Sequence, residues 1–429
     1  MSLAESYVLT REAFEDYLDH LTPDGMIFFT RPEFQIARLF STARAVFDQR
    51  GLGSIGKHVF AFSEIEQRPT PGRAPFVSGF LLKKSEFLPQ ELQQIRAILQ
   101  EEIGPGKDAA AIKVLYSPDE DSPAGIYSQI VRAPQLESVL QSSDSQLAAA
   151  TDDKPFFNQH MRWSRIRWNT IVDLFSQSKP FSARMALEDR PVAEVTLVIL
   201  FLQCALVAAS CILLPLFLLE RRGLAGTGRW RWLAYFAALG LGFMMVEIAL
   251  LQRFLLFLGQ PIYTYAIVLA ALLISTGIGS HMAGRWTMQV HSRLRQVFLA
   301  VLIVISLISL ITPPVFRACL GFAIYWRILI ALLLVAPLGF VLGIPFPLGL
   351  RLAVRQSSAL GAWAWGVNGF FTVLGTVLAL TLGMIAGFRV VLLVACLCYT
   401  CGLVAVHSLT RNVLDDVPLS APEPALSST

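Results

Sequence analysis

The 429-residue chain carries its charges unevenly, and the imbalance excludes two broad classes of protein. Residues 1–190 hold 21 Lys and Arg against 25 Asp and Glu, so they lack the basic face that nucleic-acid binding requires. Residues 191–429 hold only 14 basic residues, all arginine, and 6 acidic ones, which excludes an ordinary hydrated surface. The composition predicts a water-soluble domain at 1–190, a membrane domain at 191–410 and a polar tail at 411–429.

The first domain alternates helical and strand patterns, which is typical of part of a layered α/β sheet. The predicted helices are Arg11–Leu21, Pro32–Gln49 and Pro89–Gln100. The predicted strands are Met26–Thr30, His58–Ser63, Phe76–Leu82 and Ala111–Tyr116.

The same domain lacks the signatures of several kinds of catalytic site. No G-x-G-x-x-G follows a predicted strand, so the phosphate-binding turn of a dinucleotide fold is missing from it. It also contains no Ser/His/Asp set, no phosphate loop and no metal-ligand cluster. His20, His58 and His160 are isolated, and we interpret them as surface or capping residues.

Seven apolar stretches in the second domain are long enough to cross a bilayer, which takes about 20 residues each. They have no amphipathic solvent face, so we interpret them as transmembrane helices and the lipid bilayer as their partner. The predicted spans are Val192–Leu219, Trp232–Leu258, Tyr263–Ala283, Val297–Pro313, Ile328–Leu350, Ala362–Ala386 and Val390–Leu409.

Arginines gather in the loops after the first, third and fifth spans. These arginines are Arg221, Arg222, Arg229, Arg231, Arg285, Arg293, Arg295, Arg351 and Arg355. The positive-inside rule places these loops and the C-terminal tail in the cytoplasm, with residues 1–190 on the other side. We therefore expect an integral, multi-pass protein, with a bacterial inner membrane as its location.

Three polar residues of the spans are candidate functional residues: Glu247, Arg253 and Asn368. A carboxylate in the middle of a span is costly, so Glu247 is either a transport or ligand-binding residue or a hydrogen-bonded structural one. Arg253 lies roughly 240° around the helix from Glu247, so we expect Glu247 to find a partner on another helix, with Asn368 as one candidate. Gly240 lies on nearly the same helix face as Glu247 and would let another helix approach closely.

The fifth span contains many residues that break helices. They are Pro337, Gly339, Gly343, Pro345, Pro347 and Gly349. A broken helix in lipid can mark a binding site, because the freed backbone groups must be met by neighbours or line a cavity. Gly and Pro are also simply commoner in membrane helices, so both interpretations stay open.

All six cysteines fall in or beside apolar segments and predict no disulfide framework. Cys396, Cys398 and Cys401 form a C-x-C-x-x-C run without a matching set of further ligands. We interpret them as small packing residues.

Several stretches resemble the spermidine synthases and their membrane-fused relatives. In the first domain these are Tyr7–Phe14 with Tyr17–Gly25, similar to the family's LYT-x-E-F…L-x-P-x-G stretch, then Phe76–Leu92, and Thr151–Phe157, similar to its T-D-D-x-P-F-F run. In the second domain they are Gly242–Glu247, Gln252–Arg253, Gly259–Pro261, Pro337–Gly349 and Trp365–Gly369. Together they cover nearly the whole chain and are characteristic in combination.

The resemblance implies a partial Rossmann-like, methyltransferase-type α/β segment followed by an all-α membrane domain. It also implies that a complete protein transfers an aminopropyl or methyl group from S-adenosylmethionine or its decarboxylated form. The family's glycine-rich loop, acidic ribose ligand and catalytic Asp lie upstream of the position matching Tyr7. None of them is carried over, so we expect no cofactor site in this chain alone, and Tyr7 would lie closest to the active-site face.

Three functions remain open. The chain is the C-terminal portion of such a transferase, inactive alone, with Asp152 and Asp153 capping a helix or pairing with nearby Lys or Arg. Alternatively, it is a transporter-like module for a polyamine or related cation, contacted by Glu247. In the third reading it is a non-catalytic scaffold whose unpaired strand edge binds a partner, such as an upstream Rossmann half or a second copy of the chain.

Overall fold

The computed structural model describes residues 5–65, 78–101, 111–120, 125–159, 161–166, 192–224, 228–286 and 290–415. The chain forms two compact units, Met1–Leu197 and Val198–Thr429. His160 and most of the predicted polar tail lie outside the described residues.

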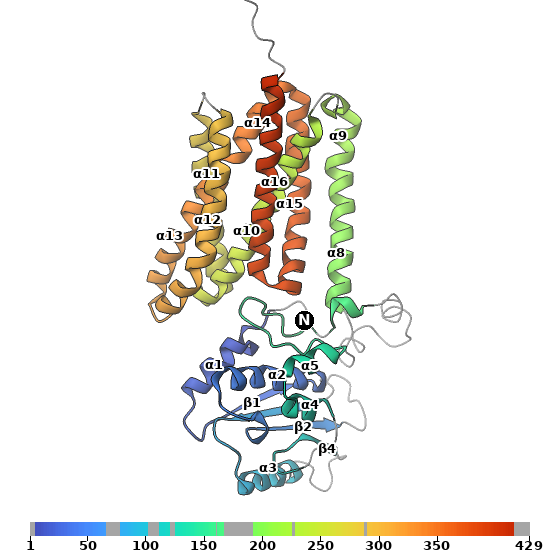
Figure 1. Ribbon diagram of the computed structural model, residues 1–429, viewed down its shortest axis with the longest axis vertical. Coiled ribbons are helices and arrows are strands. Elements are labelled where there is room, and N and C mark those ends of the chain that lie inside the picture. The colour runs from blue at the N-terminus through green and yellow to red at the C-terminus, as the bar shows by residue number, and fades with distance from the viewer. Residues whose placement is uncertain are drawn as a thin grey trace, which may run out of the picture. The chain divides into compact units, whose positions relative to one another are not determined.

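The first unit combines four described strands with helices in the alternation that the sequence predicts (Figure 1). Its strands are β1 (Met26–Arg31), β2 (Val59–Ile65), β3 (Ser78–Lys83) and β4 (Ala111–Tyr116). Its helices are α1 (Arg11–His20), α2 (Glu33–Arg50), α3 (Pro89–Glu101), α4 (Ile126–Arg132) and α5 (Leu136–Ser142), with 3₁₀ turns at Tyr7–Leu9, Ile55–Lys57 and Trp163–Arg165. The sequence did not predict α4 and α5, because seven residues each are too few to show a helical period.

The strands form one sheet in the order β1–β3–β2–β4, and every neighbouring pair is antiparallel. Because β1 and β2 both run opposite to β3, they are parallel to each other, and α2 lies in the connection between them. The register places Phe29 of β1 and Ala61 of β2 on either side of Phe80 in β3. Within the described residues, β1 and β4 are the edges of the sheet.

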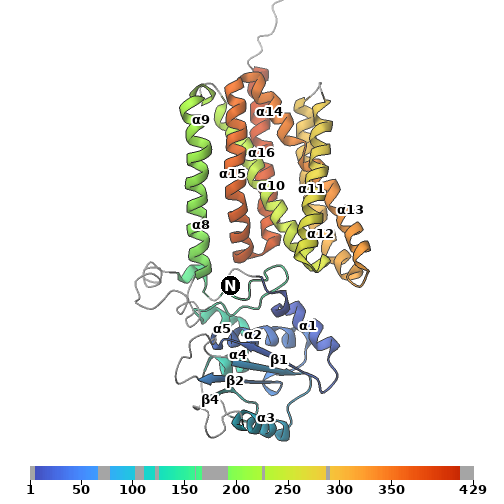
Figure 2. The same cartoon turned by 180° about the vertical axis from the view of Figure 1, so that it is seen from behind.

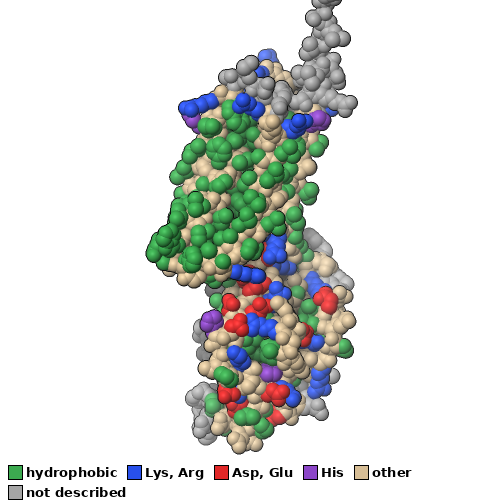
Figure 3. Space-filling view, turned by 60° about the vertical axis from the view of Figure 1, so that its left-hand side comes forward, with side chains coloured by type: hydrophobic (Ala, Val, Ile, Leu, Met, Phe, Trp, Pro, Cys, Tyr) green, Lys and Arg blue, Asp and Glu red, His purple; other side chains and the backbone are tan. Residues whose placement is uncertain are grey.

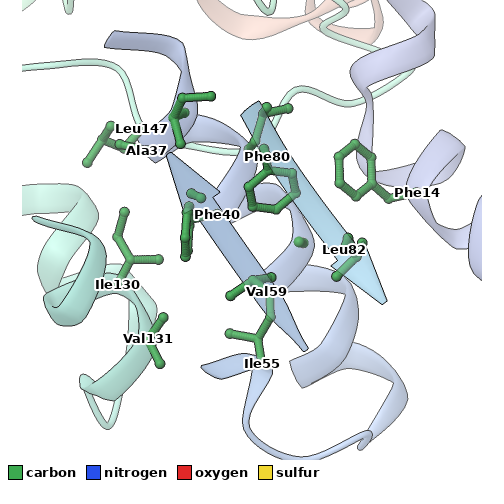
Figure 4. Close-up of a cluster of buried hydrophobic side chains, with 14 of the residues drawn as sticks. Phe14, Ala37, Phe40, Ile55, Val59, Phe80, Leu82, Ile130, Val131 and Leu147 are labelled. Carbon is green, nitrogen blue, oxygen red and sulfur yellow. The ribbon is translucent and has the colours of Figure 1, made fainter. Parts of the chain in front are cut away.

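Helices cover both faces of this sheet. On one face Phe40 of α2 packs edge-on against Phe80, with 5.1 Å between ring centroids, and Val59 lies in the same core (Figure 4). On the other face Leu92 of α3 packs against Phe60. Val59 and Phe60 are neighbours in β2 and enter opposite cores, as the alternation of side chains along a strand requires. The first unit is therefore a small α/β layer structure, with a sheet whose neighbouring strands are all antiparallel.

The described residues of the second unit form seven spans that are long and apolar enough to cross a membrane, which agrees with the predicted number. Its elements are α8 (Val192–Ala208, beginning just before the unit boundary), a π-helical turn (Ala209–Leu213), α9 (Leu214–Leu219), a 3₁₀ turn (Arg221–Leu224), α10 (Arg229–Leu258), α11 (Pro261–Gly284), α12 (Val290–Cys319), α13 (Ile324–Leu342), α14 (Pro345–Gln356), α15 (Ser358–Ala386) and α16 (Phe388–Asp415). Figure 3 shows hydrophobic side chains covering the wall of this unit on the face in view, as contact with lipid requires.

Successive spans alternate in direction, so the arginine-rich connections before α10, α12 and α15 lie at one end of the bundle, together with the end of α16 (Figure 2). The other end carries the short connections before α11, α13 and α16, as the sequence pattern predicts.

The fifth span is broken, as its prolines and glycines indicate. Helix α13 ends at Leu342, and α14 begins at Pro345, with Gly343 and Ile344 between them. The Tyr235 hydroxyl of α10 donates to the Pro345 carbonyl oxygen at 2.6 Å and fixes the second half of the span. Pro337, in contrast, lies inside α13.

Glycines set the closest contacts between the spans. A Cβ at Gly240 of α10 would lie 2.5 Å from the Asn368 carbonyl oxygen in α15, which confirms the close approach predicted there. A Cβ at Gly279 of α11 would overlap the Phe340 carbonyl oxygen in α13. Backbones can approach this closely only where no side chain separates them.

Candidate functional sites

Two of the stretches that carry the resemblance in the first unit, Tyr7–Phe14 and Thr151–Phe157, meet in space. The Thr10 hydroxyl donates to the Asp152 carboxylate at 2.7 Å across 142 residues of chain, and the Arg11 N–H donates to the Ala150 carbonyl at 2.8 Å. The Asp152 N–H donates to the Glu12 carboxylate at 3.1 Å. Thr10 is also the N-cap of α1, since its hydroxyl accepts from the Ala13 N–H at 3.3 Å. We call residues 7–12 together with 150–155 the motif junction.

A buried arginine binds the chain on both sides of residues 150–155. Arg38 of α2 is 2% exposed, and its guanidinium donates to four backbone carbonyls of the segment 148–159. The acceptors and distances are Ala148 at 2.9 Å, Phe156 at 2.9 Å, Phe157 at 2.6 Å and Gln159 at 2.8 Å. Burial lowers the pKa of this guanidinium to about 9, so it stays charged at neutral pH.

Contacts of α2 place the segment that follows residues 150–155 near the carboxyl end of β1. Helix α2 begins two residues after β1 ends, and Gln35 in its first turn donates to Asn158 at 3.2 Å. Glu33 at the start of α2 accepts from Ser63 of β2 at 2.9 Å. In α/β sheets, ligands bind at the carboxyl ends of the parallel strands, and β1 and β2 are the parallel pair here.

Tyr7 lies at the edge of the motif junction. It begins the 3₁₀ turn Tyr7–Leu9, its side chain is partly buried, and its carbonyl oxygen accepts from the Thr10 hydroxyl at 3.0 Å. The family's catalytic residues have no counterpart in this chain, so the resemblance names no residue with which Tyr7 would act.

The sequence analysis did not single out Lys154, which follows the acid pair Asp152 and Asp153. Burial, reinforced by the nearby Arg38 charge, lowers the pKa of the Lys154 ammonium to about 8. Amines with a pKa this low are enriched at functional sites, because a sizeable fraction is neutral near physiological pH.

We expect Lys154 to react with an amine-selective acylating reagent with a midpoint near pH 8. The neutral amine is the reactive form, so modification should rise as the pH increases through the pKa. Quantitative mass spectrometry of the modified chain measures it, with exposed Lys57 as the internal reference. A Lys154 profile that follows that of Lys57 at every pH would contradict the prediction.

In the second unit the three candidate residues lie apart from one another. The Asn368 amide donates to the Phe236 carbonyl oxygen at 3.1 Å, and among the described residues no hydrogen bond joins it to Glu247. No ion pair joins Glu247 to Arg253 in the described part of the chain, as their angular separation on α10 predicts. The half-buried Glu247 side chain has no hydrogen-bond partner among the described residues.

Arg253 satisfies a backbone group that a proline sets free. Its guanidinium lies 3.4 Å from the Ser309 carbonyl oxygen and 3.3 Å from the Thr312 hydroxyl in α12. Ser309 is four residues before Pro313, which has no N–H to donate to that carbonyl. This explains why α12 continues to Cys319, although the sequence analysis ended the span at Pro313.

We expect Arg253→Met to destabilise the bundle, because it leaves the Ser309 carbonyl without a donor in lipid. The loss should be about 1–3 kcal/mol, the cost of one unsatisfied buried group. Thermal unfolding of the purified chain in detergent measures it. Combining the change with Pro313→Ala restores the N–H and should recover part of the loss, whereas independent, additive effects would contradict this explanation.

A cavity of about 210 Å³ lies where the fifth span is broken. It is lined by Leu239, Gly240, Phe243, Thr276, Ser280, Leu342, Gly343, Phe346, Pro347, Asn368, Thr372 and Tyr399. Of the three candidates, only Asn368 lines it. The sequence analysis missed Tyr399, although the tyrosine stands inside the Cys396–Cys401 run that had drawn attention as a metal motif.

The structure places no metal site at that cysteine run. Cys396, Cys398 and Cys401 are free thiols, and no group of three or more His, Cys, Asp or Glu among the described residues is arranged to hold a metal ion.

Comparison of the chain with protein-family models, with curated proteins and with solved structures found no match in any of the three.

Proposed function

We propose that this chain is the membrane-embedded, C-terminal portion of a spermidine synthase-like transferase. In the complete protein an aminopropyl or methyl group would pass from an S-adenosylmethionine-type donor to its acceptor. The observation that carries the proposal is the motif junction: two of the resembling stretches of the first unit are hydrogen-bonded to each other, and the segment that follows residues 150–155 lies near the carboxyl end of β1. That edge is where α/β folds hold their ligands.

The sheet topology also supports the proposal. Strands β1 and β2 are parallel and are joined through α2, so they form a βαβ unit. Strand β3 lies between them in the opposite direction, which is compatible with a mixed sheet of the doubly wound kind. The donor site would then lie on further parallel strands that join the sheet beside β1.

The open edge of β1 is suited to that pairing. Gly25 accepts from the Lys84 N–H at 3.0 Å and continues the β1–β3 register, so alternate residues of β1 turn their backbone groups away from β3. Those residues are Met26, Phe28 and Thr30, and all three side chains are exposed. An unpaired edge with exposed apolar side chains favours the addition of another strand.

The bundle would have its arginine-rich end in the cytoplasm, because basic loops are retained on that side of a bacterial inner membrane. This orientation places the end of α16 in the cytoplasm.

The decisive test uses the DNA upstream of the codon for Met1. We expect it to encode a strand, a glycine-rich turn and an acidic residue, and we expect the encoded polypeptide to bind this chain when the two are co-expressed. The pair should bind radiolabelled S-adenosylmethionine or its decarboxylated form, whereas this chain alone should bind neither.

Thr30→Pro should abolish both association and donor binding, because it removes an N–H from the open edge without touching the β3 ladder. Thr30→Val keeps that N–H and should leave both unchanged. Equal binding by the two variants would refute pairing at β1. Association without donor binding would favour the non-catalytic scaffold. If the upstream DNA encodes no such polypeptide, the proposal of a transferase is refuted.

A further inference from the structure

The cavity at the broken fifth span is lined by several hydrogen-bond acceptors, together with the Ser280 hydroxyl. The Thr276 hydroxyl donates to the Gly339 carbonyl at 3.1 Å, and the Thr372 hydroxyl donates to the Asn368 carbonyl at 2.8 Å. Both hydroxyl protons are therefore used within the protein, and their lone pairs remain as acceptors. Asn368 uses one N–H of its side-chain amide on the Phe236 carbonyl oxygen, which leaves the amide oxygen and the second N–H available.

The break in the helix adds few donors to this lining. A helix N-terminus normally offers free N–H groups to an anion, but Pro345 and Pro347 have no N–H and together remove two donors from the first turn of α14. The C-terminal end of α13 meets this N-terminus at Gly343, so the partial charges of the two half-helices offset each other. The break is therefore a poor anion site.

Tyr399 contributes a buried hydroxyl to the site. The side chain is 1% exposed and lines the cavity from α16, and its hydroxyl forms no hydrogen bond with any described residue. The lone pairs of this hydroxyl can accept a hydrogen bond from a donor group of a ligand in the cavity.

A carboxylate continues the face of α10 that borders the cavity. Gly240 and Phe243 line it, and Glu247 is seven residues after Gly240, within about 20° of the same direction around the helix. Glu247 lies roughly 6 Å beyond Phe243 along the axis. No charged side chain lines the cavity itself. The ionised form of the Glu247 side chain would favour a cation.

We infer that this cavity binds the ammonium group of a small organic amine, with Tyr399, Thr372 and Asn368 as acceptors and Glu247 as the counter-charge. The walls formed by Leu239, Phe243, Leu342 and Phe346 suit the hydrocarbon part of such a ligand. The cavity is smaller than the roughly 300–1,000 Å³ of sites that hold drug-sized molecules, so the ligand is short. This inference is independent of transfer chemistry in the first unit.

The test is equilibrium dialysis of labelled n-butylamine against the full chain in lipid nanodiscs, with empty nanodiscs subtracted. We expect saturable binding of butylamine at neutral pH, and much weaker binding of n-butanol and butyrate, which match its length. Tyr399→Phe removes one hydroxyl and should weaken butylamine binding by about tenfold or more. The exposed Tyr263→Phe is the matched control and should leave binding unchanged.

Glu247→Gln should reduce the preference for butylamine over butanol, because the charge is lost while the shape is kept. Size-exclusion profiles of all variants check that they fold, and Tyr399→Phe breaks no hydrogen bond within the described residues. The inference is overturned if the folded wild-type chain binds no butylamine, if butanol or butyrate binds as tightly, or if Tyr399→Phe binds butylamine like the wild type.

Discussion

Gly279→Ala is expected to disrupt the α11–α13 pair, lowering the stability of the bundle by about 3 kcal/mol or more. The added methyl group would overlap the Phe340 carbonyl oxygen, and neither helix backbone can move without losing its neighbours. Alanine is a better helix former than glycine, so helix propensity alone predicts that the substitution stabilises the bundle. The measurements are the yield of monodisperse chain in detergent and its thermal unfolding midpoint.

Gly277→Ala is the matched control. Gly277 lies on the same helix, two residues away, and a Cβ there meets nothing within 4 Å. The substitution should be neutral or slightly stabilising. Equal destabilisation by the two substitutions would mean that the effect comes from the helix itself and not from the contact with α13.

Arg38→Met is expected to destabilise the first unit by about 4 kcal/mol, because four backbone carbonyls lose their donor. Methionine keeps much of the apolar stem, so the loss reports on the guanidinium. Urea denaturation of the full chain in detergent, followed by protease sensitivity of the segment 148–159, measures it. The pKa of Lys154 should also rise, since the Arg38 charge contributes to lowering it.

Arg50→Met provides the comparison. Arg50 pairs with Asp19 at 2.6 Å on the surface, and exposed ion pairs contribute little to stability. If the two arginine variants unfold at the same urea concentration, the carbonyl cluster does not hold the segment 148–159.

The sequence predicted the parts of the fold that depend on local periodicity. Seven apolar stretches predict seven spans, because a helix in lipid needs an unbroken apolar surface. The break near Gly343 and the contact at Gly240 were also predictable, since proline and glycine act on their own backbone.

The partners of buried polar groups could not be read from the sequence. Arg38 was only one residue of an amphipathic pattern, and its four acceptors are more than one hundred residues away. Arg253 was named only as a candidate functional residue, and its contact with the Ser309 carbonyl that Pro313 leaves free lies on another helix. Tyr399 was not singled out within the Cys396–Cys401 run, because only the meeting of five spans makes it part of a cavity lining.

Two close glycine contacts join helices of the bundle in pairs. Gly240 brings α10 against α15, and Gly279 brings α11 against α13, each through backbones that almost touch. The cavity lined by Tyr399 has residues of both pairs in its wall. A ligand bound in it would contact both pairs, so we expect it to raise the temperature at which they separate.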